Sequence, residues 1–169
     1  MSPTWRRHSS SWIVADKARP RVEASAPLVD ANLMLWAHHR QFPLHAAARR
    51  WWGRVLSEQA LVGIPWPSIL AFVRVSTHPR ALERPLDVVT AWEIVESWLD
   101  RPNVWIPGPG DRHRFILGPL LSAGKASGNH VPDAHLAALA IEWGLELQSA
   151  DRDFARYPGL RWQDPLAPA

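Results

Sequence analysis

The chain has 169 residues, 47% of them hydrophobic and 21% charged, which suits one globular domain and leaves too little for two. It contains no cysteine, which excludes disulfides, thiolate zinc sites and cysteine nucleophiles and fits a cytoplasmic protein. No apolar run reaches the length of about eighteen residues that a membrane helix needs, so we expect no membrane partner.

The positive charge of the chain lies at its N-terminus. Residues 1–25 carry five basic and two acidic side chains, a difference of +3, whereas the remaining 144 residues hold 14 of each sign. This segment shows no apolar periodicity, and its longest apolar stretch is too short for a secretory signal. We therefore predict that residues 1–25 are a basic, disordered extension, or precede the true start, and that residues 26–169 form the domain. A basic tail of this kind can also contact RNA.

From residue 26 onward, segments typical of strands alternate with segments typical of helices. Short apolar runs predict strands at residues 26–30, 61–64, 104–106 and 145–148, with a short fifth at 160–162. Helical spacing and capping residues predict helices at residues 32–39, 44–59, 67–77, 87–99, 111–123 and 132–144. The last helix starts at Pro132 and ends at Gly144, positions that suit these residues. The pattern predicts an α/β fold, with a parallel central sheet of four to five strands and helices on both faces.

Trp51 and Trp52 are neighbours in the predicted helix at residues 44–59. Adjacent residues point about 100° apart on a helix, so we expect that both cannot face the core fully. The other indole would then be partly exposed or lie in a groove for a partner helix.

Acidic residues follow the predicted strands. Asp30 ends the first strand, Asp151 and Asp153 follow the fourth, and Asp133 lies in the first turn of the helix that leads into the fourth. In a parallel α/β sheet, ligands bind beyond the carboxyl ends of the strands. We therefore expect these carboxylates to converge on one edge of the sheet.

Clustered carboxylates repel one another in a medium of low dielectric constant, and a divalent cation removes that cost. Mg²⁺ held by a few carboxylates keeps several waters, activates one of them and neutralises charge on a phosphate. We therefore predict a Mg²⁺ site, with Mn²⁺ as the alternative ion, at Asp30, Asp133 and Asp151. Each acid also has a purely structural interpretation, because Asp30 and Asp151 can cap the helical turns that follow them and Asp133 can complement a helix dipole.

Several segments resemble motifs of PIN-domain ribonucleases, in particular the VapC-type toxins. Residues 28–32 (LVDAN) resemble the opening motif, residues 131–140 (VPDAHLAALA) the second acidic motif and residues 149–154 (SADRDF) the closing motif. Residues 65–67 (PWP) and 72–80 (FVRVSTHPR) resemble the middle section. The resemblance covers residues 27–166, and its specificity rests on several motifs occurring in order at domain-typical spacing.

The resemblance implies a three-layer PIN sandwich and a Mg²⁺- or Mn²⁺-dependent endoribonuclease that cleaves RNA such as tRNA, rRNA or mRNA. It also implies inhibition by a VapB-type antitoxin and a homodimer. The catalytic set would be Asp30, Asp133, Asp151 and Asp153. Three further residues would support this set, with Asn32 orienting water or Asp30, Ser149 bonding a phosphate or the acids, and Arg74 contributed by the middle helix.

One position departs from the family pattern. Many PIN domains have a glutamate three residues before the arginine of the middle helix, whereas this chain has Ala71. The loss implies one metal instead of two, weaker metal affinity, or substitution by Asp153. Glu93 and Glu96 are less suitable substitutes, because their helix has the pattern of a solvated face. The alternative function is a PIN scaffold with weakened catalysis that binds RNA or an antitoxin.

Two other α/β classes fit the sequence poorly. A phospho-acceptor receiver needs a lysine late in its sheet, and the only lysines are Lys17 and Lys125, the latter in a glycine-flanked loop. A dinucleotide-binding domain needs a glycine-rich loop after its first strand, and none is present there.

Overall fold

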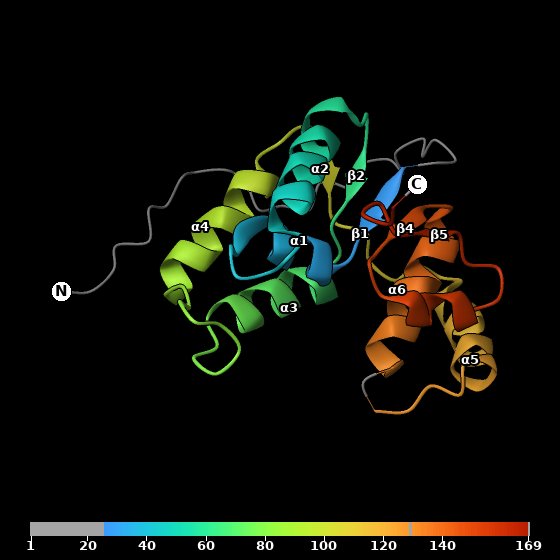
Figure 1. Ribbon diagram of the computed structural model, residues 1–169. Helices are drawn as coiled ribbons and strands as arrows, with labels where there is room; N and C mark the ends of the chain where they lie inside the picture. The colour runs from blue at the N-terminus through green and yellow to red at the C-terminus, as the bar shows by residue number, and fades with distance from the viewer. Residues whose placement is uncertain (1–25, 129, 169) are drawn as a thin grey trace.

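Five parallel strands form one central sheet in the order β3-β2-β1-β4-β5 (Figure 1). The computed structural model describes residues 26–128 and 130–168, so the predicted extension at residues 1–25 lies outside the described residues. The strands are β1 (Pro27–Val29), β2 (Val62–Gly63), β3 (Val104–Trp105), β4 (Glu146–Gln148) and β5 (Trp162–Gln163). The parallel α/β fold predicted from the alternating segments is confirmed.

Within residues 26–128 and 130–168, six helices cover the two faces of this sheet. On one side lie α1 (Ala31–His38), α2 (His45–Glu58), α3 (Trp66–Ser76) and α4 (Val88–Leu99), and on the other lie α5 (His113–Ala123) and α6 (His130–Trp143) (Figure 1). A short 3-10 helix, η1 (Arg152–Arg156), follows β4. The three-layer arrangement is therefore that of a PIN-like sandwich. Within the described ranges, no helix is long and apolar enough to cross a membrane.

The central strand β1 separates two hydrophobic cores, because successive side chains of a strand point to opposite faces. Val29 packs into the core beneath α1 to α4, and Leu28 packs into the core beneath α5 and α6. Both side chains are fully buried. Leu28 is in register with Gly63 on one neighbouring strand and with Leu147 on the other. Strand β1, which Asp30 follows, is thus hydrogen-bonded along both edges and packed on both faces.

Trp51 and Trp52 are both buried, with 7% and 4% of their surfaces exposed, so the prediction that both could not face the core fully was wrong. Helix α2 is covered over more of its circumference than a single flat core would cover. Trp52 lies edge-on to Trp98 of α4, with ring centroids 5.5 Å apart. Trp51 instead lines a pocket between α2 and the sheet, to which Pro27 of β1 also contributes. Two different neighbours therefore bury the two adjacent indoles.

Several predicted elements differ from the structure by one or two residues at their ends, and two of these shifts have a physical reason. Helix α6 begins at His130, two residues before the predicted start at Pro132. Proline is tolerated inside the first helical turn, because the N–H groups there have no partner within the helix. Strand β5 occupies Trp162–Gln163 instead of residues 160–162, since Leu147 of β4 is in register with Trp162.

Candidate active site

The carboxyl ends of β1 and β4 lie side by side and place Asp30 next to the segment at residues 149–151. The backbone N–H of Asp30 donates to the carbonyl oxygen of Gln148 over 3.1 Å, which continues the ladder by one residue beyond the strand. Asp30 then becomes the N-cap of α1, and its Oδ1 accepts from the N–H of Ala31 at 2.6 Å. The capping role considered for Asp30 is real, and its other carboxylate oxygen remains available for further contacts.

Ser149 connects the two strand ends through its hydroxyl group. This side chain is fully buried, and its Oγ donates to Asp30 Oδ2 over 2.7 Å. The same oxygen accepts from Asn32 Nδ2 at 2.9 Å and from the backbone N–H of Asp151 at 3.1 Å. Asn32 thus acts on Asp30 through Ser149, and the acid's orientation is fixed by side chains from both strand ends.

Asp133 and Asp153 meet at a histidine that the sequence analysis did not single out. Nδ1 of His130 lies 3.4 Å from Asp133 Oδ2 and 3.9 Å from Asp153 Oδ2. The carbonyl oxygen of His130 accepts a hydrogen bond of 3.0 Å from the hydroxyl group of Tyr157. The i, i+3 spacing of His130 and Asp133 was the available signal, but it pairs side chains only on a helix, and the predicted helix began after His130.

The carboxylates act on one another electrostatically. Burial is the main reason that the pKa of Asp30 rises to about 6, and the negative charges of Asp133 and Asp151 add to the rise. Burial also raises the pKa of Asp133, and the charges of Asp151 and Asp153 act in the same direction. At the carboxyl edge of the sheet, Asp133 and Asp151 thus act on Asp30, and Asp151 and Asp153 act on Asp133.

Asp151 and Asp153 form the exposed rim of this cluster. Asp151 is the N-cap of η1, and its Oδ1 accepts from the N–H of Asp153 at 2.8 Å. Asp153 forms an ion pair of 3.1 Å with Arg156 and is half exposed. One carboxylate oxygen of Asp151 is thus used locally, while the cluster as a whole stays open to solvent on the η1 side.

The middle helix contributes no acid to the site. Arg74 lies on the exposed surface of α3, and within the described residues no hydrogen bond or ion pair joins it to the four carboxylates. Ala71 is half buried on the same helix. Glu93 and Glu96 are exposed on α4, where Glu96 accepts from the indole of Trp92 at 3.1 Å. These glutamates are not among the charges that shift the pKa of Asp30 or Asp133.

The donor chemistry of the cluster fits a hard divalent cation. Carboxylate oxygens are the ligands that Mg²⁺ prefers, and burial of like charges favours a bound cation. Over residues 26–128 and 130–168, no three acidic or histidine side chains are close enough to form a ready-made coordination shell. A cation here would be held by few carboxylates with water completing its shell, which is usual for Mg²⁺.

Comparison with known proteins identifies the family. A family model described as the PIN domain matches residues 28–160. Ribonuclease VapC33 of Mycobacterium tuberculosis is 40% identical over 138 residues, an alignment that covers 81% of this chain and 96% of the relative. Ribonuclease VapC37 of the same species is 39% identical over 140 residues, covering 83% of this chain and 97% of the relative.

Solved structures show the same fold at lower sequence identity. The structure of VapBC2 from Rickettsia felis, bound to a DNA fragment from its promoter, is similar with a TM-score of 0.60 and 15% identity, over 82% of this chain and 97% of the other. VapC20 of Mycobacterium tuberculosis, described as a toxin that cleaves the sarcin-ricin loop, is similar with a TM-score of 0.57 and 18% identity, over 80% and 99% of the two chains. The sequence matches, with the acids at the strand ends, place this chain in the PIN-domain family, among the VapC ribonucleases.

Proposed function

We propose that this chain is a metal-dependent endoribonuclease toxin that hydrolyses phosphodiester bonds of RNA. The observation that carries the proposal is the buried carboxyl group of Asp30, whose pKa of about 6 reflects burial and the charges of Asp133 and Asp151. Repulsion between these carboxylates destabilises the fold when no cation is present, whereas a bound cation removes the repulsion and can assist phosphodiester hydrolysis. Its support in sequence is the identity of 39–40% to VapC33 and VapC37, which bear the name ribonuclease.

Asp30, Asp133 and Asp151 would hold Mg²⁺ or Mn²⁺, with Asp153 at the rim as the fourth acid. A bound cation supplies Lewis acidity towards a phosphate and lowers the pKa of a coordinated water. Ser149 keeps Asp30 in one orientation through a hydrogen bond of 2.7 Å, and Asn32 in turn donates to Ser149 over 2.9 Å. His130, whose Nδ1 lies 3.4 Å from Asp133 Oδ2, would orient that carboxylate at the edge of the site.

The proposed partners are a VapB-type antitoxin and a second copy of the chain. Similar folds occur in VapBC structures from Rickettsia felis, Salmonella typhimurium and nontypeable Haemophilus influenzae. Support for an antitoxin comes from those titles together with the identity to VapC ribonucleases. The homodimer rests on the resemblance alone, and sedimentation of the purified chain tests it.

The direct test of the activity is metal reconstitution. The purified full chain, freed of metal with a chelator, is incubated with total RNA, and fragments are mapped by their new 5′ ends. We expect no cleavage without metal and site-selective cleavage when Mg²⁺ or Mn²⁺ is added. Cleavage that persists in excess chelator, or that stays absent with both ions, would contradict the proposal.

A second candidate is a scaffold that binds RNA or an antitoxin without cleaving. Ala71 favours it, since α3 offers no carboxylate at the position where many PIN domains have one. Calorimetric titration with Mn²⁺ separates the two functions. Heat of binding in the wild type that disappears in Asp30→Asn supports the enzyme, and absence of binding at millimolar Mn²⁺ supports the scaffold.

A further inference from the structure

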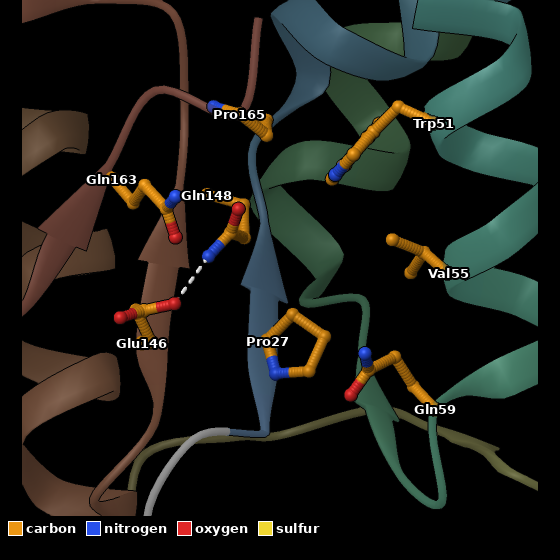
Figure 2. Close-up of a pocket in the computed structure, with 8 residues that line it drawn as sticks. All are labelled: Pro27, Trp51, Val55, Gln59, Glu146, Gln148, Gln163 and Pro165. Atoms are coloured by element: carbon orange, nitrogen blue, oxygen red, sulfur yellow. Dashed lines mark hydrogen bonds between the residues drawn. The ribbon is translucent and has the colours of Figure 1, made fainter. Parts of the chain in front are cut away.

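We propose that a pocket beside the acidic cluster binds one base of the RNA strand and selects bases that carry an exocyclic amino group. The inference rests on the proposed ribonuclease function, because the base would belong to the bound substrate. The pocket has a volume of about 380 Å³ and lies between α2 and the strands β1, β4 and β5 (Figure 2). This is near the lower end of known ligand pockets, which suits a single base or nucleoside.

The pocket exists because two strands present polar side chains on a face that helices cover elsewhere. Glu146, Gln148 and Gln163 point into it from β4 and β5 (Figure 2). Strands of a parallel sheet that are buried on both faces are usually rich in Val, Ile and Leu. Val29 and Val62, which lie on the same face of the sheet as the pocket, follow this rule. Amides and a carboxylate at these positions indicate a surface suited to a polar ligand.

The opposite wall is apolar and aromatic. Trp51 and Val55 line it from α2, and Figure 2 shows the nitrogen end of the Trp51 indole directed from α2 towards β1. Within the described residues, the indole N–H of Trp51 has no hydrogen-bond partner. An aromatic wall opposite an array of hydrogen-bonding groups suits a flat heterocycle, because a base can contact the wall and present its edge to the amides.

The charge of the pocket excludes a phosphate group as its occupant. Among the described residues that line it, Glu146 is the only charged side chain and none is basic. A phosphate would be repelled by this carboxylate, whereas a neutral base would not. The recognised part of a nucleotide is therefore its base.

The hydrogen bonds inside the pocket favour amino groups. Gln148 Nε2 donates to Glu146 Oε2 over 2.6 Å, which fixes the orientation of the amide (Figure 2). Across the described part of the chain, Oε1 of Gln148 and Oε1 of Glu146 have no donor, so both remain available as acceptors. Glutamine pairs well with adenine through its N6 amino group, and glutamate accepts from the N4 amino group of cytosine. Uracil and hypoxanthine present an oxygen in the same place.

Backbone hydrogen bonds connect two residues that line the pocket to Asp30 and Ser149 of the candidate active site. The carbonyl oxygen of Gln148 accepts from the N–H of Asp30, and the carbonyl oxygen of Gln163 accepts from the N–H of Ser149 at 3.1 Å. In Figure 2, Gln148 lies towards the arrowhead end of β1, the end that Asp30 follows, and Pro27 lies at the other end. A strand held at the acids can thus place a nearby base in the pocket.

Side-chain amide signals in the NMR spectrum test this inference directly. The sequence has four glutamines, of which Gln59, Gln148 and Gln163 line the pocket. Gln41 is outside it and bonds to Ala81 and Glu83, so its signal is an internal reference. The ¹⁵N-labelled full chain, in chelator to prevent cleavage, is titrated with two matched pairs of nucleosides: adenosine with inosine, and cytidine with uridine.

We expect adenosine or cytidine to shift the signals of Gln148 and Gln163 at millimolar concentration, with inosine and uridine weaker by about tenfold. Glu146→Gln should reduce this difference, because it replaces a carboxylate acceptor by an amide that can also donate, and Gln41→Leu should keep it. Glu146 is only partly buried, and a glutamine oxygen can accept the hydrogen bond from Gln148, so this variant should fold. Equal responses to both members of each pair, or no response at Gln148 and Gln163, would overturn the proposal.

A second arm identifies the source of the base. Short single-stranded oligoadenylate should shift the same signals at a lower concentration than adenosine, because the strand also contacts the rest of the site. Saturation at equal concentrations would assign the pocket to free nucleosides and would overturn the RNA-strand assignment. RNA cleavage is measured separately. A chain that shows the base preference but does not cleave RNA would refute the ribonuclease function and not the pocket. A chain that cleaves RNA but shows no base preference would refute only the pocket.

Discussion

Ser149 donates a hydrogen bond of 2.7 Å to Asp30, although the two residues lie 119 positions apart in the sequence. The bond joins the end of β4 to the end of β1, and the same hydroxyl oxygen accepts from Asn32 and from the N–H of Asp151. One buried serine therefore sets the positions of two of the proposed metal ligands.

Ser149→Ala should weaken metal binding while the fold is retained. Loss of a residue that orients a metal ligand typically costs about 10–100-fold in metal affinity. We expect a loss of this size for Mn²⁺ in calorimetric titration. Ser97→Ala is the matched control, because Ser97 lies on the exposed surface of α4 and, among the described residues, its hydroxyl group bonds only to the carbonyl oxygen of Ile94. Equal Mn²⁺ affinities of wild type and Ser149→Ala would show that the serine does not orient the site.

The metal-free protein should lose stability as the pH rises from about 4 to 6. The pKa of Asp30 is about 6 in the folded chain against an ordinary value of 3.8, so the folded state binds more protons in this window. Stability from this group is therefore greatest below the lower pKa and falls as the pH passes through the window. The raised pKa of Asp133 acts in the same direction.

Asp30→Asn should remove part of this pH dependence and stabilise the metal-free chain at pH 7 by roughly 1–3 kcal/mol. Asparagine also caps helices well, so α1 should keep its N-cap. Thermal denaturation in chelator at several pH values measures the effect, with the exposed Asp111→Asn as control. A variant that is less stable than wild type at pH 7 would contradict the assigned burial of charge.

Glu142→Ala should destabilise the fold without changing the acidic cluster of the active site. Glu142 accepts from the N–H groups of Gly110 and Arg112 at 3.1 Å each and lies 3.1 Å from Nδ1 of His113, which joins the start of α5 to α6. The variant leaves the buried His113 and the less buried N–H groups of Gly110 and Arg112 without this partner, at a cost of about 1–3 kcal/mol in the free energy of unfolding.

Chemical denaturation measures this cost, and Glu93→Ala is the control because Glu93 is exposed on α4. Gly110→Ala tests the same contact from the other side. A Cβ atom at this position would lie 2.7 Å from Oε1 of Glu142, so the carboxylate has to move. If Glu142→Ala unfolds at the same denaturant concentration as Glu93→Ala, the contact does not stabilise the fold.

The order of elements could be predicted from the sequence because strand and helix periodicities differ strongly here. Residues 26–30 form a short apolar run, and the structure places β1 at Pro27–Val29. The acids could be located at the sheet edge because parallel strands end on the same side. Gly144 could be predicted as a helix end, and its φ of 68° is a conformation that glycine adopts without strain.

Features that depend on tertiary contacts could not be predicted in this way. Burial of both Trp51 and Trp52 requires neighbours on two sides of α2, one of them Trp98 of a helix far along the chain. The contact of His130 with Asp133 requires α6 to begin before its proline. The base pocket arises from strand pairing, because it joins Trp51 to side chains of β4 and β5.

The most direct test of the central claim compares RNA cleavage by the wild type, Asp30→Asn and Asp133→Asn in the same Mg²⁺ buffer, with circular dichroism to verify folding. Loss of a metal ligand removes several kcal/mol of transition-state stabilisation, so the cleavage rate of each variant should fall by about 100-fold or more. The control Glu93→Gln should cleave at the wild-type rate. Folded variants of Asp30 and Asp133 that cleave at the wild-type rate would contradict the assignment of these carboxylates as the metal site.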